Sequence, residues 1–354
     1  MGQSTRTFLR RTALASLKTA GLFHIVKNSA WRRQRLLILC YHGVAMEDES
    51  QWRPYLYIDL HTLERRLEIL RRGSYTVLPL DEAVQRLFEK DLPPRSVVLT
   101  FDDGTYDFYR QGYPLIRNFG FPVTVYLTTY YCDHQRPVFV LMCSYLLWKA
   151  RSLRAVKLDE FGIKYPVDLR SEVARQAAEK ELAQWVEGLN LTGEQRDQVA
   201  CRLAQRLGID YRDLCQKRIL QLMNADEVRQ LAREGVDFQL HTHRHRLPRD
   251  QELFLKEIRE NRTRVLNATG RPARHFCYPS GAYRPEFLPW LAHEGLISAT
   301  TCDTGIAHCS NNPLLLKRLV DTSGRSDLEF EGWVSGVSQF ISRGRRAPLA
   351  YRPD

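Results

Sequence analysis

The chain has 354 residues, and its 52 lysines and arginines against 41 aspartates and glutamates give a formal net charge of +11. With 44% hydrophobic and 10% aromatic residues it is neither disordered, collagen-like nor a coiled-coil rod, and we expect a packed core. The basic residues are spread as short pairs without a DNA-reading motif, so we expect no nucleic-acid partner; ordinary solubility or an anionic surface explains the charge.

Residues 1–34 form a basic N-terminal arm. Paired arginines precede a moderately apolar run, but Lys18 interrupts that run and no small-x-small cleavage site follows it. We expect a basic amphipathic helix, either a packing element or a peripheral contact with an anionic membrane. With no clear cleavable signal peptide or transmembrane helix, a cytoplasmic or peripheral inner-membrane location is favoured. Eight scattered cysteines favour reduced thiols, with a Cys302–Cys309 disulfide as the alternative.

The next part of the chain, residues 35–137, alternates strand and helix patterns. Apolar runs at 35–44, 96–105 and 121–129 predict buried strands, and helical spacing at 61–73 and 81–90 predicts helices. This alternation predicts a parallel sheet covered by helices, with ligands at the carboxyl ends of the strands.

Residues 138–226 change in character to charged amphipathic segments without strand signals, which predicts a helical insertion. The alternation then resumes over 227–342, with a possible last strand at 314–320 and a final helix at 328–344, before a basic tail at 343–354. We therefore expect one α/β barrel of about 250 residues rather than two independent domains.

Two adjacent acids, Asp102 and Asp103, follow the strand predicted at 96–105. One of them would commonly cap the next helix while the other is solvated. In a loop at a strand end, however, neighbouring side chains point in different directions. One acid can then bind a metal while the other acts on a bound water.

Three histidines lie within five residues in HTHRH, directly after another apolar run. The i, i+4 spacing of His241 and His245 places both imidazoles on one face, within reach of a divalent metal ion, most simply zinc. Asp103 completes a His-His-Asp set with open positions for water, as a hydrolytic centre requires. His243 points off that face and is expected in an outer layer or at the surface.

Three motifs in order, TFDDG at 100–104, HTHRH at 241–245 and CYPSG at 277–281, resemble those of the polysaccharide deacetylases with a NodB-homology domain, carbohydrate esterase family 4. The resemblance covers about residues 36–342 and implies a distorted (β/α) barrel with the helical insertion. By position it implies Asp102 as general base, and Asp103, His241 and His245 as metal ligands. It also implies that the backbone N–H of Ser280 holds the oxyanion, although alone CYPSG reads as an ordinary turn.

The chain departs from the commonest family pattern in two places. Cys277 replaces the arginine that usually opens the third motif, and no C-terminal L-x-H motif supplies a general acid. Leu39-Cys40-Tyr41-His42 resembles the opening strand of circularly permuted, poly-N-acetylglucosamine deacetylase-like members, which makes His42 the candidate acid; the alternative is a buried histidine hydrogen-bonded in the barrel. Arg318 could hold Asp102 ionised, or pair with a structural acid.

The resemblance implies a metal-dependent hydrolase that removes N-acetyl groups from amino sugars of a polysaccharide or its precursor, in exopolysaccharide or cell-envelope modification. Its substrate partner would be an N-acetylated poly- or oligosaccharide, and the oligomeric state stays open. Tyr278 and Tyr283 could stack on the sugar or simply pack. The alternatives are a carbohydrate-binding barrel that lost turnover, and a deacylase or deformylase of a small molecule.

Overall fold

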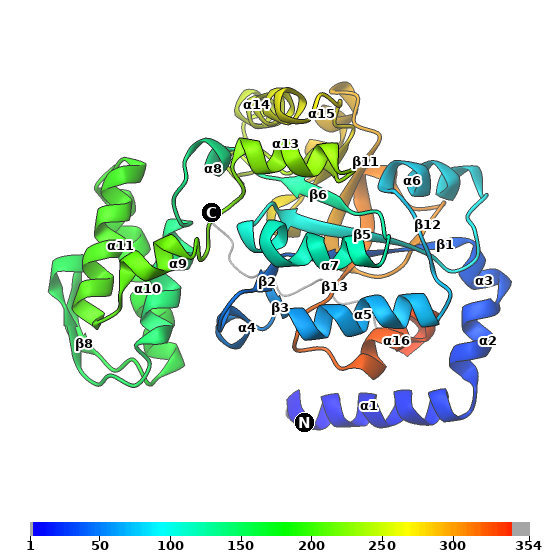
Figure 1. Ribbon diagram of the computed structural model, residues 1–354, viewed down its shortest axis with the longest axis horizontal. Coiled ribbons are helices and arrows are strands. Elements are labelled where there is room, and N and C mark those ends of the chain that lie inside the picture. The colour runs from blue at the N-terminus through cyan, green and yellow to red at the C-terminus, as the bar shows by residue number, and fades with distance from the viewer. Residues whose placement is uncertain (1–2, 342–354) are drawn as a thin grey trace. The chain divides into compact units, whose positions relative to one another are not determined.

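The fold is described by a computed structural model that covers residues 3–341, with side chains from residue 10 onward. The chain divides into two compact units, one formed by residues 1–130 and 225–354 and the other by 131–224. In the first unit, seven described parallel strands pair in a closed ring, so the predicted α/β barrel is confirmed (Figure 1). In the order of the ring they are β1 (Arg35–Tyr41), β5 (Ser96–Asp103), β6 (Thr124–Leu127), β9 (Asp237–Leu240), β10 (His275–Cys277), β11 (Ser298–Thr304) and β13 (Leu316–Val320).

The barrel strands are almost continuously buried, as the apolar runs predicted. In β1 and β5 every residue except one at an end is buried, because helices cover the outer face and side chains fill the interior. Short strands that the sequence did not reveal flank the ring. They are β4 (Thr76–Val77) beside β5, β12 (Ala307–His308) antiparallel to β1, and the separate pair β2 (Gly43–Ala45) and β3 (Tyr57–Asp59).

Helices surround the ring in Figure 1, and side chains at their first residues fix where several of them begin. Asp59 accepts the Thr62 N–H at the start of one helix, and Asp250 accepts the Leu253 N–H at the start of another. These helices of the first unit are α4 (Glu49–Trp52), α5 (Leu60–Arg72), α6 (Leu80–Glu89), α7 (Tyr113–Asn118), α13 (Ala225–Arg233), α14 (Gln251–Thr269), α15 (Phe287–His293), α16 (Asp327–Ser335) and α17 (Val337–Ile341).

The final predicted helix, 328–344, is interrupted. Gly336 has a φ of 98°, a left-handed conformation that glycine adopts without strain, and it separates α16 from α17. The predicted basic tail at 343–354 lies outside the described residues.

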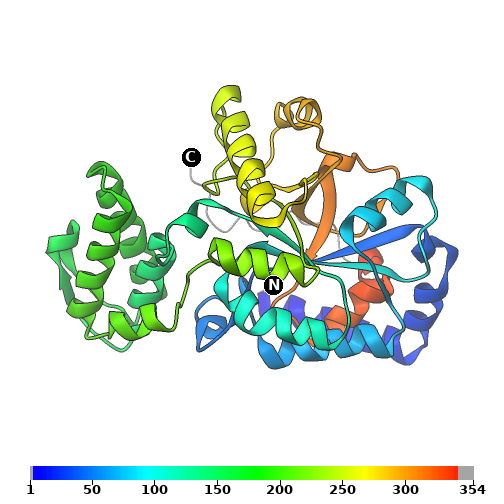
Figure 2. The same ribbon diagram turned by 45° about the horizontal axis from the view of Figure 1, so that its top comes forward.

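The second unit spans residues 131–224, so it begins earlier than the predicted insertion at 138–226 and ends close to the expected place. The expectation of helices alone was wrong, because β7 (Val156–Leu158) and β8 (Ile163–Val167) form an antiparallel pair. In β8 only the two end residues are buried, a pattern too short to be recognised in the sequence. Within this unit α9 contacts both α10 and α11 (Figures 1 and 2). Its helices are α8 (Tyr130–Asp133), which begins one residue before it, α9 (Phe139–Lys149), α10 (Glu172–Gly188), α11 (Gly193–Leu207) and α12 (Tyr211–Gln216).

The N-terminal arm forms three helices rather than one, α1 (Gln3–Thr19), α2 (Leu22–Asn28) and α3 (Ala30–Arg33), with left-handed Gly21 between the first two. Leu14 and Phe23 are buried against Val337 of α17, and Arg11 pairs with Glu329 of α16. Arg32 is fully buried and donates to three backbone carbonyls. These contacts use the arm as a packing element, and a membrane contact stays a prediction. No helix within residues 3–341 has the length and apolar composition needed to cross a membrane.

Candidate active site

The predicted ligand residues follow two strands of the barrel, and the backbone turns sharply to present them. Asp103 ends β5 with a φ of 70°, and His245, in the loop after β9, has a φ of 55°. Left-handed backbone at residues other than glycine costs free energy and is concentrated at functional sites. Both turns occur where the carboxyl ends of parallel strands meet, which is the usual position of a ligand site in such a sheet.

Asp103, His241 and His245 lie together. The Nε2 atoms of both histidines are 3.3 Å from Asp103 Oδ1, and one ligand atom from each of the three residues falls within 4.8 Å of the others. His241 Nδ1 is 2.8 Å from the Cys277 carbonyl oxygen, which can only accept, so Nδ1 carries a proton and Nε2 is the ring atom that faces Asp103 and could bind a metal ion. Two imidazoles and one carboxylate fit a divalent cation and leave coordination positions for water or substrate.

Asp102 points to a different partner. Its two oxygens accept hydrogen bonds of 2.7 Å each from Nη1 and Nη2 of Arg318, and both side chains are buried. Burial by itself would raise the pKa of Asp102, but the charge and hydrogen bonds of the Arg318 guanidinium outweigh it and hold that pKa well below its usual range. Asp102 is therefore ionised and fixed in orientation, and neither acid serves as an exposed helix cap.

His42 directly follows β1 and lies near Asp102. Its Nε2 is 3.7 Å from Asp102 Oδ2, beyond hydrogen-bond distance, and 18% of its side chain is exposed. Its Nδ1 is buried without a hydrogen-bond partner among the described residues. The ring is thus neither locked into the barrel by a hydrogen bond nor fully closed off from solvent.

The third motif forms a tight turn after β10. Ser280 adopts a left-handed conformation, with φ 56° and ψ 13°, inside the short 3₁₀ turn Pro279–Gly281. The role of its N–H as an oxyanion donor stays a prediction. Tyr278 is fully buried and donates to the Leu314 carbonyl, so packing explains it, whereas Tyr283 is only partly buried.

Two thiols that sequence reasoning did not connect with the acid also touch Asp102. The sulfur atoms of Cys40 and Cys277 are 3.5 Å and 3.4 Å from Asp102 Oδ2, and Cys277 Sγ is 3.0 Å from Arg318 Nη2. Cys277 therefore lies beside the ion pair, while the arginine comes from β13. All eight cysteines are free, so the Cys302–Cys309 disulfide is not formed.

His243 is turned away from the ligand set. Its Nδ1 is 2.9 Å from Thr129 Oγ1, its side chain is buried, and burial lowers its pKa to about 4. It belongs to a layer of residues that supports the ligands from behind. The sequence motifs indicated no other member of this layer.

Helix α14 supplies the centre of that layer. Asn261, fully buried, accepts the His241 N–H at 2.9 Å and donates to the Leu127 carbonyl and to Thr129 Oγ1. One helical turn earlier, Glu257 accepts the Arg244 N–H through its carboxylate and the His243 N–H through its backbone oxygen. The histidine loop is thereby tied to one face of α14, and an i, i+4 pair on a following helix is too common a pattern to have been recognised.

We expect Asn261→Ala to weaken divalent-metal affinity about 10–100-fold, because outer-shell partners fix the orientation of a ligand. The measurement is titration of the metal-stripped protein with zinc, alongside the thermal midpoint without metal. Asn267→Ala, at an exposed position of the same helix, is the matched control and should change neither quantity. Unchanged affinity in a folded Asn261→Ala protein would remove Asn261 from this role.

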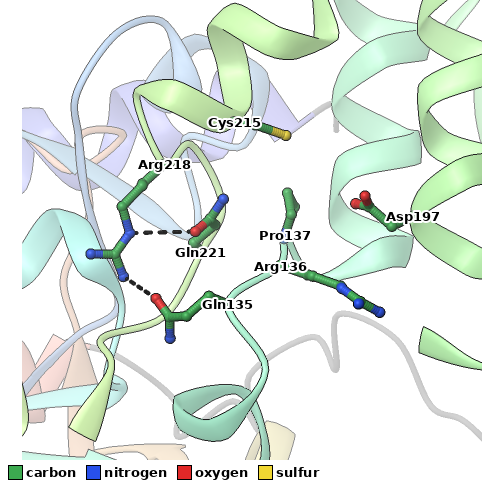
Figure 3. A pocket seen from close by; sticks show the side chains of 7 residues that line it. All are labelled: Gln135, Arg136, Pro137, Asp197, Cys215, Arg218 and Gln221. Atoms are coloured by element: carbon green, nitrogen blue, oxygen red, sulfur yellow. Dashed lines mark hydrogen bonds between the residues drawn. The ribbon is translucent and has the colours of Figure 1, made fainter. Parts of the chain in front are cut away.

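A separate polar cavity of about 410 Å³ lies within the second unit (Figure 3). There the Arg218 guanidinium donates to the side-chain oxygens of Gln135 and Gln221, and Asp197 faces them from α11. Every residue that lines it belongs to residues 131–224, so it contains none of the predicted site residues.

Comparison with known proteins places this geometry in context. The family profile described as "Polysaccharide deacetylase" matches residues 89–180 and 194–319, which is more than half of the chain. The curated "Poly-beta-1,6-N-acetyl-D-glucosamine N-deacetylase" of Escherichia coli (strain K12) is 28% identical over 101 residues, which span 28% of this chain and 14% of that protein. The "Putative polysaccharide deacetylase YxkH" of Bacillus subtilis (strain 168) is 28% identical over 104 residues, spanning 28% of this chain and 35% of that one.

Solved structures share the fold at low identity. The Streptococcus pyogenes deacetylase PplD, in complex with acetate, superposes with a TM-score of 0.55 at 17% identity, covering 83% of this chain and 96% of that one. The structure of IcaB from Ammonifex degensii gives 0.53 at 16% identity, covering 85% and 97%. The shared barrel extends over most of both chains.

Proposed function

Because the chain belongs to the polysaccharide deacetylase family, we propose that it is a metal-dependent hydrolase that removes N-acetyl groups from amino sugars of a polysaccharide or its precursor. The observation that carries the proposal is the Asp103–His241–His245 set beside the ion-paired Asp102. The name of the E. coli relative, which deacetylates poly-β-1,6-N-acetyl-D-glucosamine, supports an N-acetylated amino sugar as substrate.

We propose zinc as the ion held by Asp103, His241 and His245, since imidazole and carboxylate without thiolate suit it in catalytic sites. When bound, such an ion polarises the acyl carbonyl and lowers the pKa of a coordinated water. Asp102 would accept the proton of the attacking water, and its contacts with Arg318 keep it ionised for that task.

The leaving amine nitrogen must receive a proton when the amide bond breaks. We assign that proton to His42, which lies 3.7 Å from Asp102 Oδ2 and is partly exposed. The Ser280 N–H would donate to the carbonyl oxygen as it gains negative charge. Arg318 acts through Asp102, so it is a positioning residue. It would hold Asp102 ionised in place of the arginine that the third motif lacks.

The direct experiment measures acetate released from N-acetylglucosamine oligomers by the purified protein, after metal removal and again after zinc is restored. We expect release to stop without metal and to return with it. Sugar binding without acetate release would favour a carbohydrate-binding barrel that lost turnover. Release of formate or another acid from a panel of small molecules would favour a deacylase or deformylase of a small molecule. Absence of metal-dependent release from every N-acetylated amino sugar tested would contradict the proposal.

A further inference from the structure

A second set of donor atoms includes Asp102 and shares no residue with the first. Cys40 Sγ and His42 Nε2 are 3.5 Å and 3.7 Å from Asp102 Oδ2, and one ligand atom from each residue lies within 4.8 Å of the others. Unlike the Asp103 set, this one contains a sulfur atom. Cys40 is on β1, His42 directly follows β1, and Asp102 is on β5, the strand paired with β1.

Two of the three spacings between these atoms match a tetrahedral site. Metal–sulfur and metal–nitrogen or –oxygen bonds of about 2.3 Å and 2.0–2.1 Å separate adjacent ligand atoms by roughly 3.3–3.6 Å. The two separations from Asp102 Oδ2, 3.5 Å and 3.7 Å, are close to these values, and the Cys40 and His42 ligand atoms lie within 4.8 Å of each other. The unpartnered Nδ1 of His42 leaves the ring tautomer unfixed, and Nε2 can present a lone pair without breaking a hydrogen bond.

We propose that Cys40, His42 and Asp102 form a second site, specific for a thiophilic divalent cation such as Cd²⁺ or zinc in excess, and that occupation of this site is inhibitory. A soft thiolate ligand selects such ions over hard ones. Burial raises the pKa of the Cys40 thiol well above its ordinary value, so the thiol is protonated in the free protein. Binding forms the sulfur–metal bond and releases the thiol proton to solvent.

Arg318 is the main opposing factor, since its guanidinium already bonds both Asp102 oxygens. Each carboxylate oxygen has two lone pairs, so Oδ2 can keep the Arg318 bond and bind an ion in place of its weak contact with the Cys277 thiol at 3.4 Å. Repulsion from the guanidinium makes this site weaker than the Asp103 set. The second ion therefore binds only when the cation is in excess.

Inhibition rests on the proposed function, because the ion would occupy the proposed acid and base; binding does not depend on it. The experiment titrates the full-length, metal-stripped protein with Cd²⁺, counts bound ions by equilibrium dialysis and follows the ultraviolet absorption of the cadmium–thiolate bond. Cys40→Ser should bind one ion fewer per chain than the wild type and lose part of that absorption. Cys302→Ser, whose sulfur is 3.8 Å from Arg318 Nη2 and outside the set, should match the wild type.

His42→Gln is the second variant, at a partly exposed position, and it should lose the same ion if Cys40→Ser does not fold. The cadmium concentration that halves acetate release, relative to each protein's own activity, should rise at least about tenfold in Cys40→Ser. Equal stoichiometry in wild type, Cys40→Ser and His42→Gln would overturn the site. Loss of the ion in Cys277→Ser alone would move it to the other thiol beside Asp102. If the variants lose the ion but cadmium inhibits them as it does the wild type, only the inhibitory role is overturned. If the wild type releases no acetate, the proposed function is contradicted and the binding result still holds.

Discussion

Asp102→Asn should lower kcat for deacetylation by about 10²–10⁴, the usual contribution of a general base, while the metal ion of the Asp103–His241–His245 set stays bound. The amide cannot take the proton of the attacking water, yet Asp102 is not one of the three residues of the Asp103 set. The measurements are the rate of acetate release at saturating substrate and the metal content of the purified variant.

The substitution also leaves Arg318 without its carboxylate, and breaking a buried ion pair by removing one partner costs about 3–5 kcal/mol. A matched control separates the two effects. Asp321 forms a second fully buried pair with Arg66, at 2.9 Å, outside the proposed machinery. Arg66 keeps a second pair with Asp327, so Asp321→Asn should lower the thermal midpoint less than Asp102→Asn does and retain kcat well below that midpoint. Equal losses of kcat in the two variants would mean that Asp102 acts only through stability.

The barrel could be predicted because its signal is local and repeated. Each buried strand is a run of apolar residues ending in polar ones, as in the segment from Ser96 to Asp103. Such runs can be recognised in the sequence without knowledge of the tertiary structure. The elements that were missed carry weaker signals. β4 has two residues, and β8 buries only Ile163 and Val167, so neither shows a period.

The ligand set could be predicted because His241 and His245 are four residues apart, and Asp103 follows a recognisable strand. The pairing of Asp102 with Arg318 spans 216 residues and depends on β1 lying between β5 and β13 in the ring. Spacing along the chain holds no information about such a contact. The same holds for Asn261 and Cys40, whose importance comes only from what the fold places against them.

His241→Ala should abolish stoichiometric metal binding and with it metal-dependent activity. Its Nε2 is one of only three protein donors in the Asp103 set, so the loss should exceed the about 10–100-fold effect of removing an outer partner. The measurement is metal content after dialysis against zinc, together with the rise in thermal midpoint that zinc produces in the wild type.

His243→Ala is the matched control, two residues away in the same loop and just as buried. Its imidazole contacts Thr129 rather than the ligand set, so the variant should keep one metal ion per Asp103 set even though its stability falls. Because both variants remove a buried imidazole, a general loosening of the loop would lower metal content equally in each. Only coordination through His241 predicts that the two variants differ in metal content. A His243→Ala protein without metal would show that the loop, not the individual ligand, controls metal binding.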